Sequence, residues 1–127
     1  MSLDITPSMP VGRQIIQSYG DYRFRVSDVV FDSPVLVFPN ETITWTVSSI
    51  DKLSLDAFSD VIKADPAIDI LLIGCGKGIA LIPPVLRDEI KAVGIIIEPM
   101  DTGAACRTFN VLTTEDRRVA AALIPVE

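Results

Sequence analysis

The sequence predicts an α/β fold, with a mixed central sheet in a three-layer single domain that spans residues 1–127. Its 127 residues are 49% hydrophobic, which is enough to bury one core. Short β-branched and aromatic runs fill the first half, and after about residue 50 strand-like runs alternate with helical ones. We therefore expect N-terminal antiparallel strands followed by β-α-β-α-β-α-β, with residues 1–20 partly irregular.

The first half predicts an antiparallel meander. Its strand-like runs are YRFRV (22–26), PVLVF (34–38) and TITWTV (42–47), and turn signals such as Ser33-Pro34 separate them. In the last run, Trp45 is flanked by threonines, which is the alternation of a half-buried strand.

The second half predicts three helices. The first begins at Ser54, a favourable N-cap, and ends before Asp65-Pro66. Pro83 and Pro84 open the second, because a first turn does not need their missing amide donors. The third covers 102–114, where apolar residues recur at helical spacing.

Three strands alternate with these helices. The run IDILLIG (68–74) is continuously apolar after Asp69, as in a central parallel strand buried on both faces. VGIIIE (93–98) is expected to be another buried strand. RVAAALIP (118–125) is ambiguous because alanine favours helix, but its place in the alternation favours a closing strand. Right-handed crossovers would make these strands parallel.

Composition and charge exclude several classes of function. The net charge is -6 and the pI about 4.5, with basic residues scattered, so neither nucleic acid nor an anionic membrane surface is an expected partner. No apolar run reaches the roughly 18 residues that span a bilayer, and the start lacks signal-peptide features. We expect a cytoplasmic protein without membrane insertion.

The sequence contains no histidine. This removes Ser-His-Asp and Cys-His catalysis and the commonest metal ligand, so no cofactor and no metal site is predicted. The two cysteines show no C-x-x-C spacing, which is typical of free thiols in a reducing compartment. Cys75 beside Lys77 is a candidate thiolate without an evident base, whereas Cys106 is expected to pack in the core.

Ligands of open α/β sheets bind outside the carboxyl ends of parallel strands. This rule selects the glycine loop GCGKG (74–78) and the segment EPMDT (98–102), which should lie at the same sheet edge. The glycine spacing matches neither a dinucleotide fingerprint nor a P-loop, so a tight turn is favoured, with anion binding by Lys77 and the loop amides as the alternative. The candidate ligand-binding cleft comprises Gly74, Gly76, Lys77, Glu98, Asp101, Thr102, Arg107 and Asn110.

The start of the third helix is explained by capping, because Asp101 or Thr102 can accept from its unpaired first amides. A polar stripe then runs along one helix face, through Gly103, Arg107, Asn110 and Thr114. It is interpreted either as a solvated face or as a cleft that offers polar groups to a partner.

The segment MDTGAACRTFNVL with RRVAAALIP resembles a family of largely uncharacterised bacterial and archaeal proteins. Its eukaryotic relatives include mitochondrial respiratory complex I assembly factor 3 and the adipogenesis-associated domain protein. LLIGCG, YGDYRFRV and SPVLVFP also fit the family, so the likeness covers nearly the whole chain. The resemblance implies a single-domain three-layer α/β fold without established catalysis, and it marks Gly74, Gly76, Asp101, Thr102, Thr108, Phe109 and Asn110. Arg107 is not shared with the mitochondrial members, and Pro99 departs from the hydrophobic residue expected at its position.

Two functional hypotheses follow. The first is a non-catalytic protein-interaction or assembly module, with a protein partner such as a respiratory or membrane-protein assembly component. The alternative is a small-molecule or anion-binding protein, or a weak enzyme, that uses the glycine loop and the Asp-Thr helix start.

Overall fold

The computed structural model describes residues 3–5 and 12–127. Nine strands are present in these ranges: β1 (Leu3–Asp4), β2 (Ile16–Gly20), β3 (Arg23–Val26), β4 (Val29–Phe31), β5 (Val35–Val37), β6 (Thr42–Thr44), β7 (Ile70–Gly74), β8 (Ile96–Met100) and β9 (Val119–Leu123). The helical elements are the 3-10 turns η1 (Ile50–Lys52) and η2 (Leu55–Phe58) and the α-helices α1 (Ser59–Ile62), α2 (Pro84–Ala92) and α3 (Thr102–Thr114).

A mixed five-stranded sheet forms the centre, in the order β6-β5-β9-β7-β8. Strand β7 runs parallel to both of its neighbours, β8 and β9, whereas β5 is antiparallel to β9. Successive residues of β9 face opposite sides, with Ala120 and Ala122 in one core cluster and Val119, Ala121 and Leu123 in the other. The sheet is therefore buried on both faces along its central strands, as predicted for residues 68–74.

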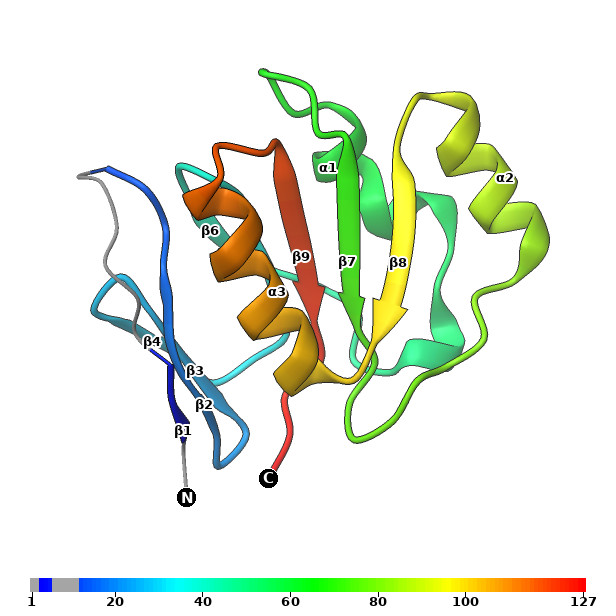
Figure 1. Ribbon diagram of the computed structural model, residues 1–127. Coiled ribbons are helices and arrows are strands. Elements are labelled where there is room, and N and C mark those ends of the chain that lie inside the picture. Colours follow the sequence, from blue (N-terminus) through cyan, green and yellow to red (C-terminus); the bar gives the residue numbers. More distant parts are fainter. Residues whose placement is uncertain (1–2, 6–11) are drawn as a thin grey trace.

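Helices cover both faces of this sheet, which confirms the predicted fold class (Figure 1). On one face, α2 and the η2–α1 segment pack through residues such as Phe58 and Ile90, both fully buried. On the other face, α3 packs through Ala105, Cys106 and Phe109, which are also fully buried.

A second sheet adds a further layer outside α3. It is antiparallel and four-stranded, in the order β1-β2-β3-β4. Ile16, Phe24 and Val26 belong to the same core cluster as the inner face of α3, so the helix lies between two sheets (Figure 1). The predicted meander thus divides, because its early strands form this outer sheet while β5 and β6 join the central one.

Three local expectations can be compared with the structure, and two of them need correction. Within the segment 1–20, which was expected to be partly irregular, residues 12–15 have no regular secondary structure while residues 16–20 form β2, whose pairing with β3 shifts register between Ile16 and Ser18; residues 1–2 and 6–11 lie outside the described residues. The run at 93–98 enters a strand only at Ile96, and this strand, β8, is an edge of the central sheet in the described residues, with Ile96 and Glu98 exposed. The expected first helix begins as the four-residue 3-10 turn η2 and continues as the four-residue helix α1, and the Ser54 side chain makes no capping bond. The single domain over residues 1–127 stays a prediction.

Candidate functional site

Thr102 ties together the carboxyl ends of three strands. Its buried hydroxyl donates to the carbonyl oxygen of Ile124, just after β9, at 2.6 Å, and accepts from the amide of Gly76, just after β7, at 3.0 Å. The amide of Thr102 donates to the carbonyl oxygen of Gly76 at 2.8 Å, and the amide of Cys75 donates to that of Met100 at 2.8 Å. We call this cluster of Gly74, Gly76, Asp101 and Thr102 the strand-end junction.

Glycine occupies the two positions of the junction for different structural reasons. A Cβ on Gly74 would lie 2.9 Å from Leu123 Cδ2 and 3.1 Å from Thr102 Cα, closer than side chains normally approach. Gly76 instead has a φ of 97°, which L side chains rarely adopt, and open space around it. The glycine loop is therefore the tight turn that its sequence favours.

The remaining polar groups near the junction also have partners within the protein. Asp101 caps α3 by accepting from the Ala104 amide at 2.8 Å, as predicted. Lys77 pairs with Glu127 at 3.2 Å, although both side chains are largely exposed. Hydrogen bonds, first from Lys77 and then from Tyr22, hold the pKa of the Glu127 carboxyl below its ordinary value.

Arg107 and Asn110 point to the outer sheet rather than to the glycine loop. Arg107 Nη1 donates to the hydroxyl of Tyr19 at 2.6 Å. Asn110 is buried, and its amide accepts from the main-chain N–H of Ile16 at 3.0 Å while donating to the carbonyl of Ile16 at 2.9 Å. Gly103 lies against the Tyr19 ring. The polar stripe is thus not an open cleft, because Gly103, Arg107 and Asn110 contact β2, while Arg107 and Thr114 are also exposed to solvent, as on a solvated face.

The eight residues of the predicted cleft therefore do not form one set. Gly74, Gly76, Asp101 and Thr102 meet at the junction, and Lys77 lies beside it. Glu98 is exposed on the edge strand β8, opposite Leu72 in the register with β7. Arg107 and Asn110 contact β2 instead. Anion binding by the glycine loop stays a prediction.

Neither cysteine is placed as an open nucleophile. Both are free thiols and buried. Burial raises the pKa of the Cys106 thiol well above its ordinary value, which outweighs the lowering by neighbouring Arg107. Cys75 is 9% exposed and its thiol lies 3.5 Å from the carbonyl oxygen of Ile73. Core packing, which was expected for Cys106, is what the structure shows.

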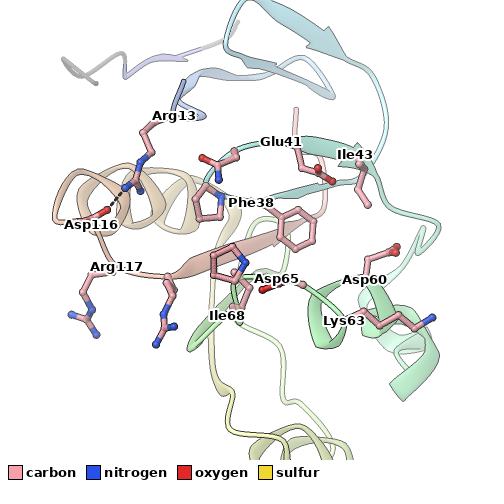
Figure 2. A pocket seen from close by; sticks show the side chains of 15 residues that line it. Arg13, Phe38, Glu41, Ile43, Asp60, Lys63, Asp65, Ile68, Asp116 and Arg117 are labelled. Atoms are coloured by element: carbon pink, nitrogen blue, oxygen red, sulfur yellow. Dashed lines mark hydrogen bonds and ion pairs between the residues drawn. The ribbon is translucent and has the colours of Figure 1, made fainter. Parts of the chain in front are cut away.

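A pocket of about 580 Å³ lies at the other end of the parallel strands, beside the residues that lead into β7 and β9. Its apolar centre includes Phe38, Ile43 and Ile68. Figure 2 shows charged side chains around this centre, with Arg13, Asp116 and Arg117 on one side and Asp60 and Lys63 on the other. Further lining residues are Pro39, Asn40, Glu41, Ala64, Asp65, Pro66 and Arg118. We call this the amino-end pocket.

The end of α3 positions one wall of the amino-end pocket. Asp116 has a φ of 62°, its amide donates to the carbonyl of Thr113, and the amide of Arg117 donates to that of Leu112 at 3.0 Å. These bonds define a Schellman motif, which ends the helix. Its usual glycine is replaced by Asp116, whose carboxylate pairs with Arg13.

Sequence reasoning missed this pocket, because its lining comes from four separated parts of the chain. The pair Arg117-Arg118 at the start of a predicted strand was the available signal. Within the described ranges, no three His, Cys, Asp or Glu side chains are grouped so that they could hold a metal ion. In the same part of the chain, no helix is both long and apolar enough to cross a membrane.

The geometry defines a class: an α/β domain whose third helix is clamped between a mixed sheet and a small antiparallel sheet. The chain belongs to the family described as proteins of unknown function DUF498/DUF598, whose model matches residues 16–124. This confirms the resemblance inferred from the sequence.

Similar proteins and solved structures support the same family membership. The NADH dehydrogenase [ubiquinone] 1 alpha subcomplex assembly factor 3 of Drosophila melanogaster is 38% identical over 116 residues, which cover 87% of this chain but 58% of the fly protein. An uncharacterised protein of Rhodobacter capsulatus is 35% identical over 87% of this chain and 84% of its own length. The crystal structure of an outer membrane protein from Bartonella henselae has a TM-score of 0.83 and 35% identity, and covers 91% of this chain and 98% of that one.

Proposed function

We propose that the protein is a non-catalytic interaction module that binds a subunit of a respiratory or other membrane-protein complex during its assembly. The relationship to complex I assembly factor 3 supports this role. The chain spans less than two thirds of the length of those relatives, so the proposal concerns the part that is shared. A cytoplasmic location belongs to the proposal and agrees with the two free thiols.

One observation carries the proposal: an exposed apolar surface follows the glycine loop. Between β7 and α2, Ile79 is 74% exposed and Leu81 is 89% exposed, while the alternate residue Ile82 is buried in the core at 1%. Val85, in the first turn of α2, adds a further side chain that is 71% exposed. We call Ile79, Leu81 and Val85 the apolar loop surface.

This surface is held in place rather than free to collapse. Ile82 and Ala80 pack against the core cluster on the α2 side of the sheet. Exposed aliphatic side chains gathered on one segment favour contact with another protein, because covering them removes apolar area from water. An unassembled membrane-protein subunit presents apolar surface that such a segment can cover.

The test is site-specific photo-crosslinking in the native host, with the photoreactive residue at Leu81. The matched control carries it at Val30, an aliphatic residue of β4 that is 60% exposed on the outer sheet. We expect Leu81 to crosslink to subunits of a membrane complex and Val30 not to do so. Equal crosslinking at both positions, or crosslinks at Leu81 to abundant soluble proteins alone, would contradict the proposal.

A double substitution tests the consequence for assembly. Ile79→Ser with Leu81→Ser should reduce the amount of assembled complex on native gels, while Val29→Ser with Val30→Ser should leave it unchanged. Circular dichroism of both purified variants checks that they are folded. An unchanged assembly profile in the folded loop variant would rule out this surface as the contact site.

A further inference from the structure

The amino-end pocket combines an apolar centre with walls of opposite charge. Phe38 and Ile68 are largely buried, at 7% and 5% exposure, and Ile43 packs beside them. Pockets of roughly 300–1,000 Å³ that join apolar lining to a few polar groups are typical of small-molecule sites. The volume of about 580 Å³ lies in that range.

One wall has a basic excess. Arg13 is matched by Asp116, and Arg118 pairs with Asp69 at 3.1 Å. Within the described residues, the guanidinium of Arg117 has no ion-pair or hydrogen-bond partner. The hydrogen bond from the Arg117 amide to the Leu112 carbonyl fixes the backbone position from which this side chain extends. An unpaired guanidinium at a pocket wall is suited to bidentate binding of a carboxylate.

The rest of the lining, which we call the other wall, has an acidic excess and surrounds Phe38, with Glu41 and Asp65 on opposite sides of its ring (Figure 2). Glu41, Asp60 and Asp65 contribute three carboxylates against one ammonium group, that of Lys63. None of these four side chains has an ion-pair partner in the part of the chain that the structure describes. The acids are also not grouped to hold a metal ion there, so a spread ammonium-binding wall is the better match.

We propose that the amino-end pocket binds a zwitterion, namely a short peptide with free amino and carboxyl termini. Its carboxylate pairs with Arg117, its ammonium group with Asp65 and Glu41, and an apolar side chain lies over Phe38 and Ile68. A sphere of the pocket's volume is about 10 Å across, which matches the span of about three extended residues. A tripeptide therefore reaches both walls, whereas a single amino acid reaches one.

The test is an NMR titration of the ¹⁵N-labelled protein with the tripeptide Ala-Leu-Ala. Its N-acetylated form, its C-amidated form and free leucine are the comparison probes. We expect amides along the pocket to shift, with about tenfold weaker binding when either terminus is blocked, because each block removes a charged hydrogen-bonding group. Leucine should bind more weakly than the tripeptide.

Paired variants assign the two walls. Arg117→Gln should remove the preference for the free carboxylate and keep that for the free amine, and Asp65→Asn should do the reverse. Arg23→Gln, at an exposed position on β3, is the matched control and should bind as the wild type does. Unshifted amides outside the pocket show that each variant is folded.

Several results would overturn the proposal. These are no shifts with up to about 10 mM tripeptide, shifts confined to other surfaces, or equal binding of free and blocked peptides. Tighter binding of leucine than of the tripeptide would assign the pocket to a single amino acid instead. Variants that lose both preferences together, or neither, would contradict the two-wall arrangement.

Discussion

The two ends of the parallel strands β7 and β9 are built in opposite ways. At the carboxyl end, the Thr102 hydroxyl and the main chain of the glycine loop bond to each other, so the polar groups there have partners inside the protein. At the amino end, Arg117 and three carboxylates surround a pocket without such partners in the described residues. Polar residues at a strand end therefore indicate a site only when the fold leaves them unmatched.

The strongest test of this difference is Thr102→Val. The substitution leaves the buried Gly76 amide and the Ile124 carbonyl without their partner, so we expect a loss of about 2–4 kcal/mol in the free energy of unfolding. Chemical denaturation measures it. Thr102→Ser keeps the hydroxyl and is the control; equal stability of the two variants would show that the junction bonds contribute little.

Gly74→Ala tests the close packing of the same junction. The added Cβ meets Leu123 and the main chain of Thr102, and overpacking of this kind costs about 1–3 kcal/mol. Gly78→Ala is the matched control, because nothing lies within 4 Å of its Cβ position. Thermal unfolding of both variants decides the matter, and a Gly74 variant as stable as the Gly78 one would contradict the model of a closed junction.

Glu127→Gln should have a smaller effect that depends on pH. Because the folded-state pKa of Glu127 is lowered, its contribution is present above the ordinary value of 4.5 and is lost as the pH falls below it. The Tm difference between wild type and variant should therefore be visible at pH 6, shrink in acid, and shrink with added salt, since the pair with Lys77 is exposed. A difference that is constant across pH would exclude this ion pair as its cause.

Arg117→Gln should have the smallest effect on stability, within about 0.5 kcal/mol, because its guanidinium has no partner in the described residues. Urea denaturation with the wild type in parallel provides the measurement. The substitution is expected to weaken ligand binding in the amino-end pocket instead. A clear loss of stability would mean that Arg117 serves the fold, and the contrast between the two strand ends would fail.

Local patterns predicted much of the fold. The helix over 102–114 with its Asp101 cap and the strand in RVAAALIP follow from short-range spacing and alternation, and both are present. Asn110 is a residue whose partner these local patterns could not predict. Its position on a polar stripe was readable, but its partner is the main chain of Ile16, 94 residues away.

By itself, the sequence determined the order of the elements, the α/β class, the capping of α3 and the membership in a family, because these depend on residues close together in the chain. Tertiary structure alone decided that the N-terminal strands form a second sheet against α3, that the glycine loop is closed by Thr102, and that charged residues from four segments surround one pocket. The physical reason is that burial and hydrogen-bond pairing between distant segments determine which polar groups stay available.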